Sequence, residues 1–113
     1  MRELINYSEF EKIDIRVGTI IFAELNVKLK KPSFILKIDF GKEIGIKKSS
    51  AQLTKNYNND ELINKQIAAV INFPRKQIGS LISEVLVLGF PDYSSEPILI
   101  SPDIKVANGV RLF

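Results

Sequence analysis

The stretch SFILKIDF, residues 33–40, limits the fold more than any other part of the chain. Apolar residues occupy every second position along it, at Phe34, Leu36, Ile38 and Phe40. Lys37 and Asp39 fall on the opposite face, and this alternation is typical of a β-strand with one buried side. The chain must therefore contain a sheet that covers an apolar core.

Other extended segments surround this strand. DIRVGTIIFAEL (14–25) is β-branched and aromatic, and it contains Gly18, a residue that within a strand often marks a bend or bulge. Further strands are predicted at 65–73 and 83–90, shorter extended pieces at 97–100 and 110–113, and a loop at 74–81.

The segment after residue 40 predicts a hairpin whose second strand is irregular. Gly41-Lys42 suits a two-residue type II′ turn, which makes the flanking strands antiparallel neighbours. Ile44 and Ile46 have one parity, whereas Ala51 and Leu53 have the other. Because a one-residue slip would turn the apolar side outward, we expect a bulge within 47–50.

Two short helices complete the predicted elements. Ser8 and Glu11 have the spacing of a capping box, which predicts a helix at 8–13. NNDELIN (58–64) predicts a helical turn capped by Asn58 or Asn59.

Together these elements predict an all-β protein with short helices, a five-stranded Greek-key barrel of the OB type with N- and C-terminal extensions. An open sandwich is the alternative. The 113 residues correspond to a single domain, 1–113. Apolar runs fall short of the roughly 20 residues of a membrane span, and the start is too charged for a secretory signal. We therefore expect a cytoplasmic protein with no membrane span.

Composition argues against catalysis. The chain has neither Cys nor His, so thiolate chemistry, the commonest general base and the commonest metal ligands are missing. A Ser/Lys dyad at 47–50 would need a buried lysine, and this stretch is polar. The sequence predicts that the protein is not an enzyme and needs no cofactor or metal.

Positive charge is concentrated in the middle of the chain. Between Lys28 and Lys76 there are eleven basic and four acidic residues, whereas the two ends are net negative. Such a field favours a polyanionic partner; the alternative is a set of separately solvated lysines.

Two polar clusters lie in this basic segment, GIKKSSAQLTKNY (45–57) and NFPRKQIGSLISE (72–84). Their cations, hydroxyls and amides suit phosphate and ribose contacts. The candidate RNA-binding residues are Lys47, Lys48, Ser49, Ser50, Gln52, Asn72, Arg75, Lys76, Gln77 and Ser83. The structural alternative makes Asn72 a strand-end hydrogen bonder, and Arg75 and Lys76 solvated tips.

The aromatic residues indicate what kind of RNA is bound. Phe34 and Phe40 share an apolar face and Phe73 is in phase with the strand before it, so these rings are expected in the core. Tyr57 and Phe22 are the rings expected to be free for stacking. With few rings for unpaired bases, we expect a folded RNA to be recognised through phosphate and ribose.

Four segments resemble the stand-alone tRNA-binding domains, especially the CsaA-like proteins: DIRVGTI (14–20), 31–57, INFPRKQIGSLISEVLVLG (71–89) and NGVRL (108–112). The resemblance implies an OB-fold homodimer that binds the outer corner of tRNA. Related domains are appended to aminoacyl-tRNA synthetases, so a synthetase is a possible partner. CsaA itself is described as a protein-export chaperone, which makes unfolded or exported polypeptides the alternative ligand.

Within the resemblance, the matching polar positions also include Glu84. Synthetase-appended relatives generally have a small residue and a methionine after the serine that corresponds to Ser83, whereas this chain has Glu84-Val85-Leu86. That departure places a negative charge beside the expected RNA surface. The candidate dimer interface, or alternatively the closure of the barrel within one subunit, consists of Tyr7, Phe10, Ile98, Ile100, Val110, Leu112 and Phe113.

Overall fold

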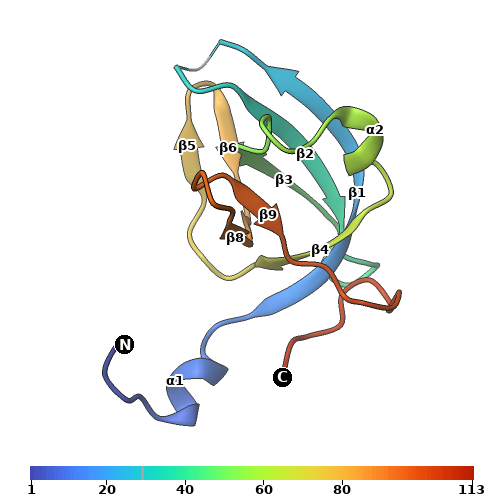
Figure 1. Ribbon diagram of the computed structural model, residues 1–113. Coiled ribbons are helices and arrows are strands. Elements are labelled where there is room, and N and C mark those ends of the chain that lie inside the picture. The colour runs from blue at the N-terminus through green and yellow to red at the C-terminus, as the bar shows by residue number, and fades with distance from the viewer. Residues whose placement is uncertain (29) are drawn as a thin grey trace.

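A curled five-stranded antiparallel sheet forms the body of the protein, seen in a computed structural model that describes residues 1–28 and 30–113 (Figure 1). The strand order is β3-β2-β1-β4-β7, with β1 (Ile15–Asn26), β2 (Ser33–Asp39), β3 (Ile46–Ala51), β4 (Gln66–Val70) and β7 (Leu86–Val87). Two further ribbons pair β5 (Lys76–Ile78) with β6 (Leu81–Ser83), and β8 (Gly89–Pro91) with β9 (Pro97–Leu99). This confirms the predicted fold class, a mostly-β protein whose curled sheet is that of an OB-like half-barrel.

The core lies on the concave side of this sheet. Its centre consists of the four apolar residues predicted from 33–40, joined by Ile20, Ile67, Ala69 and Leu62. Gly18 lies against this core: an added Cβ would come within 2.6 Å of the Ile38 Cγ2 atom. Gly18 therefore permits close packing of β1 on β2, and the irregularity of β1 falls instead between Ile20 and Phe22.

The β2–β3 hairpin is antiparallel, as predicted, but its turn is longer than predicted. Residues 41–45 connect the strands, with Gly41 and Gly45 both at positive φ, and the Phe40 N–H donates to the Gly45 carbonyl over 3.0 Å. The predicted type II′ turn and the bulge at 47–50 are both wrong. The pairing runs in register from Asp39–Ile46 to Phe34–Ala51. The strand keeps its phase by leaving Ile46 55% exposed and burying Ser49.

Residues 74–90 differ most from the prediction. The expected loop at 74–81 is mostly β5 and the start of β6, which turn at Gly79-Ser80 with Gly79 at φ +60°. The expected single strand at 83–90 is divided among β6, β7 and β8. The reason is a change of partner, because the Glu84 N–H donates to the Lys48 carbonyl of β3, whereas Leu86 and Val87 pair with β4. This segment joins the two edges of the curled sheet.

Both predicted helices are present. α2 (Asn59–Leu62) begins at Asn58, whose side chain accepts the Glu61 N–H. α1 (Tyr7–Glu11) begins one residue earlier than predicted, and its capping contact joins the Asn6 N–H to the Glu9 carboxylate over 3.1 Å, not Ser8 to Glu11.

The two ends of the chain lie on the same side of the sheet. Figure 1 shows α1 set apart from the sheet, and none of the five residues of α1 is buried. The predicted extended piece at 110–113 forms a single bridge from Arg111 to Arg16. Within the described ranges, no helix is long and apolar enough to cross a membrane.

Candidate nucleic-acid interface

The two polar clusters predicted from the sequence lie against each other. The Lys48 N–H on β3 donates to a Glu84 carboxylate oxygen over 3.0 Å, and the Ser50 N–H donates to the Ser83 hydroxyl over 3.2 Å. These two hydrogen bonds join residues that lie 36 and 33 positions apart in the sequence, at the point where β3 meets the end of β6. A single ligand can therefore reach both clusters.

The hydroxyls of the three candidate serines form hydrogen bonds within the protein at this junction. Ser49 is 1% exposed and Ser83 8% exposed. Both hydroxyls donate to the Val85 carbonyl, over 3.1 and 3.3 Å. The Ser50 hydroxyl donates to that of Ser33 over 3.2 Å. Because buried hydroxyls need such partners, these serines hold the sheet edges together and present little to a ligand.

Lys47 and Lys48 point to opposite faces of β3. Lys47 is half-buried and pairs across the strands with Ile38 of the core, whereas Lys48 is exposed and pairs with Lys37. Successive side chains of a strand alternate between its faces, so a regular β3 cannot place both lysines on one patch. Gln52, just beyond the strand, is exposed.

The second cluster contributes exposed cations. Arg75 forms an ion pair with Glu84 over 3.3 Å. Lys76 is exposed on β5, and the Gln77 side chain donates to the Gly79 carbonyl over 2.8 Å across its own turn.

Asn72 is engaged with the chain that leads into β1. Its side-chain oxygen accepts the Asp14 N–H over 2.9 Å and its amide donates to the Lys12 carbonyl over 2.8 Å. Asp14 in turn bonds Arg16, and that hydrogen bond raises the pKa of the Arg16 guanidinium. This is the strand-end role that the sequence left as an alternative.

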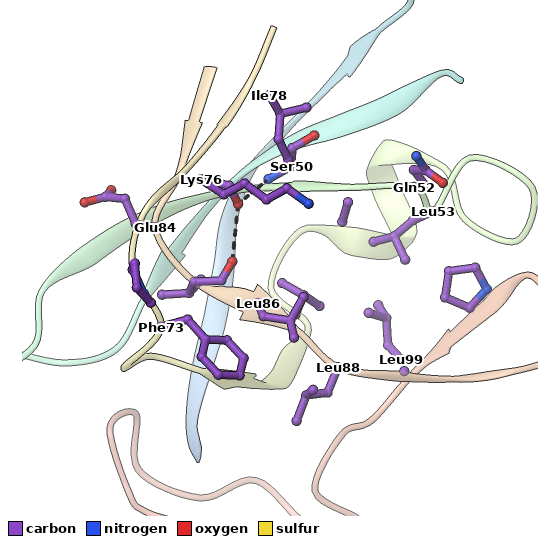
Figure 2. A pocket seen from close by; sticks show the side chains of 17 residues that line it. Ser50, Gln52, Leu53, Phe73, Lys76, Ile78, Glu84, Leu86, Leu88 and Leu99 are labelled. Carbon is purple, nitrogen blue, oxygen red and sulfur yellow. Dashed lines mark hydrogen bonds between the residues drawn. The ribbon is translucent and has the colours of Figure 1, made fainter. Parts of the chain in front are cut away.

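Beside the junction lies a pocket of about 520 Å³ between the end of β3, the β5–β6 hairpin and the β7–β9 segment. Its walls are largely apolar, and Figure 2 shows Phe73 beside Leu86 at one side, with Gln52 and Leu53 at the other. Lys76 lies along its rim near Ser50.

The aromatic predictions need correction. Phe34 and Phe40 are buried as expected, but Phe73 is 51% exposed because β4 already ends at Val70. Tyr57 packs against the core and its hydroxyl accepts the Leu99 N–H, so it is not free to stack. Phe22 is half-buried with the Lys37 ammonium 4.8 Å from its ring centre.

Phe73 is thus an exposed ring that the sequence reasoning missed. The signal was Pro74, since a proline has no N–H to donate and usually marks the end of a central strand.

A curled β-domain with adjoining basic clusters is a common form of nucleic-acid binder, and comparison with known families agrees with it. The profile of the family described as "Putative tRNA binding domain" matches residues 15–111, so the chain belongs to this family.

Solved structures place it near CsaA within that family, as the sequence predicted. It is similar to the chaperone CsaA of Bacillus anthracis str. Ames, with a TM-score of 0.92 and 41% identity over 98% of this chain and 100% of that one. It is also similar to the CsaA chaperone protein of Picrophilus torridus, with a TM-score of 0.90 and 50% identity over 97% and 100%.

A curated relative is the methionine–tRNA ligase of Methanococcoides burtonii. It is 33% identical over 108 residues, which are 96% of this chain and 16% of the relative. The chain therefore spans about a sixth of that relative's length.

Proposed function

We propose that the protein binds structured RNA, and tRNA in particular, through one surface formed by β3 and the β5–β6 hairpin. We call this surface the basic face; it consists of Lys48, Gln52, Lys76 and Gln77. Arg75 lies at its margin, and Lys47 lies on the other face of β3. The observation that carries the proposal is the joining of the two clusters at Lys48 and Glu84, which fixes cations from distant parts of the sequence on one unit. Ser49, Ser50, Ser83, Glu84 and Asn72 hold the underlying strands.

The chemistry of this face suits the RNA backbone. Lysines neutralise phosphates as point charges, and exposed amides donate to phosphate or ribose oxygens. Phe73 adds one ring on which a base could stack. One ring cannot read a run of bases, so the shape of a folded RNA should decide recognition. The proposed function is binding without catalysis, in the cytoplasm where tRNA is used.

A homodimer is the proposed assembly. Apolar side chains are exposed at both ends of the chain, including Tyr7 at 65%, Leu112 at 48% and Phe113 at 102%. The Leu112 N–H donates to the Ile15 carbonyl, so the C-terminal segment is fixed beside the start of β1. A second copy that covers these side chains would give the assembly two basic faces. A synthetase is a further candidate partner, given the ligase relatives.

The pocket favours a second candidate function, the binding of unfolded or exported polypeptides. Its largely apolar walls include Phe73 and Leu86, which are about half exposed, and such a surface suits apolar side chains of an extended chain. In this alternative the lysines serve solubility.

A salt titration separates the two candidates. Binding of a fluorescein-labelled, in vitro transcribed tRNA is followed by anisotropy between about 50 and 200 mM KCl. For RNA binding, log affinity falls linearly with log salt, with a slope of about −0.7 to −0.9 for each phosphate neutralised. Lys48→Ala should flatten this slope by about one contact, whereas Lys105→Ala, an exposed lysine outside the basic face, should leave it unchanged.

The polypeptide probe is an unrelated protein that is kept unfolded by reduction and carboxymethylation of its cysteines. If polypeptides are the ligand, they bind with little response to salt, and Leu86→Ser weakens them without affecting RNA. Affinity for tRNA that barely responds to salt would refute the RNA proposal.

A further inference from the structure

The carboxylate of Glu84 lies between the main chain of Lys48, a residue of the basic face, and the side chain of Arg75 at its margin. One oxygen accepts the Lys48 N–H over 3.0 Å, and the other lies 3.3 Å from a terminal nitrogen of the Arg75 guanidinium. The Glu84 N–H donates to the Lys48 carbonyl over 2.8 Å. Glu84 is thus fixed to β3 through both its main chain and its side chain.

The pair is asymmetric in a way that strengthens it. The Glu84 side chain is 19% exposed and that of Arg75 is 69% exposed. Surface ion pairs are usually weak because two long side chains must both be immobilised and water screens the charges. Here the carboxylate is already held, so only Arg75 loses freedom when the pair forms. The two groups line a hollow of about 340 Å³ together with Lys48 and Ser80.

We propose that Glu84 is an internal counter-anion that holds Arg75 on the protein and keeps it from neutralising an RNA phosphate. The inference rests on the proposed RNA-binding function. A phosphate approaching Arg75 meets the fixed negative charge of Glu84, and like charges in contact oppose binding. Glu84 is therefore a positioning residue that limits how many phosphates the protein neutralises, because it keeps Arg75 from contributing to that number.

The test begins with Glu84→Gln. Glutamine keeps a side-chain oxygen that can accept the Lys48 N–H, while the charge opposite Arg75 is removed. With the tRNA probe and salt range given above, the slope of log affinity against log salt should steepen by about 0.7 to 0.9, one additional phosphate. Affinity at low salt should rise accordingly. Glu24→Gln is the matched control, because Glu24 is exposed on β1 and takes part in none of the ion pairs found among the described residues.

Arg75→Ala distinguishes release of Arg75 from a general change of charge. In the wild-type background it should leave the slope unchanged and the affinity within about twofold. In the Glu84→Gln background it should return the slope to the wild-type value. The inference would be overturned if Arg75→Ala alone flattened the slope by one phosphate contact. It would also be overturned if Glu84→Gln did not steepen the slope, or if the steeper slope of Glu84→Gln remained after Arg75 was replaced.

The failure of this inference can be told apart from the failure of the proposed function. If wild-type protein binds tRNA with a steep salt response and the variants depart from the stated pattern, only the role of Glu84 is refuted. If wild-type protein shows no salt-dependent binding, the proposed function itself fails. Should Glu84→Gln not fold, as judged by circular dichroism, Arg75→Ala in the wild-type background still decides: an unchanged slope supports the inference and a loss of one contact overturns it.

Discussion

The Ser49 hydroxyl donates to the Val85 carbonyl over 3.1 Å. Ser49 lies on β3, one edge strand of the sheet, and Val85 lies in the segment that leads into β7, the other edge strand. The contact is buried, and the Ser83 hydroxyl donates to the same carbonyl. A polar residue at a core-facing position of β3 therefore joins the sheet's edges directly beneath the basic face. The serines that hold the strands together are therefore different residues from the exposed cations that can contact a ligand.

Ser49→Ala tests that separation. Loss of a buried hydrogen bond should lower the free energy of unfolding by about 1–2 kcal/mol, measured by urea denaturation. At temperatures where the variant is folded, its affinity for tRNA should stay within about twofold of wild type. Ser94→Ala, in the exposed turn after β8, should change neither quantity. A large loss of tRNA affinity with unchanged stability would mean that the Ser49 hydroxyl contacts RNA itself.

Gly18→Ala tests the close approach of β1 and β2. The new Cβ would lie 2.6 Å from Ile38 Cγ2 and 2.8 Å from the Phe40 ring, so the core must move. Overpacking of this kind should destabilise the protein by about 1–3 kcal/mol in urea denaturation. Combined with Ile38→Ala, which makes room, the cost should be less than the sum of the two single changes. Additive costs would contradict the packing role.

Asp92 should make stability depend on acid. Its pKa is lowered, first by the hydrogen bond from the Asn56 amide and then by the N–H groups of Glu96 and Ser94. A carboxyl whose pKa is depressed by folding adds stability at pH values above its ordinary pKa, and that stability is lost as the pH falls through the folded-state pKa. Asp92→Asn should therefore flatten the melting temperature's decline between about pH 5 and pH 2. Asp103→Asn, an exposed control, should leave the decline as it is in wild type.

The dimer proposal is tested with Tyr7→Ser combined with Leu112→Ser. If these exposed apolar side chains form the interface, light scattering coupled to gel filtration should show a dimer for wild type and a monomer for the double variant. Tyr93→Ser is a matched control, because Tyr93 is fully exposed in the turn between β8 and β9. Monomeric wild-type protein would exclude the homodimer.

Local sequence pattern was enough to predict β2 and α2. The alternation in 33–40 predicted β2 and its core residues, and capping chemistry predicted α2. These inferences succeed because side-chain periodicity and helix capping depend on neighbours in sequence. Tyr57 and Phe73 show the limit of such reasoning: Tyr57 is held by a hydrogen bond from Leu99, 42 positions away, and Phe73 is released because its strand ends early.

The order of residues along the chain thus determined a β-rich core, its family resemblance and the concentration of positive charge in the middle. Only the tertiary structure decided which polar residues face a ligand. Ser49 became a buried bridge to a carbonyl 36 positions away, and Lys47 and Lys48 took opposite faces because the β2–β3 pairing has no bulge. Arg75 met Glu84, whose carboxylate is held by the Lys48 N–H from 36 positions away. Hydrogen-bond satisfaction and strand alternation operate between segments, and the sequence of one segment does not state its partner.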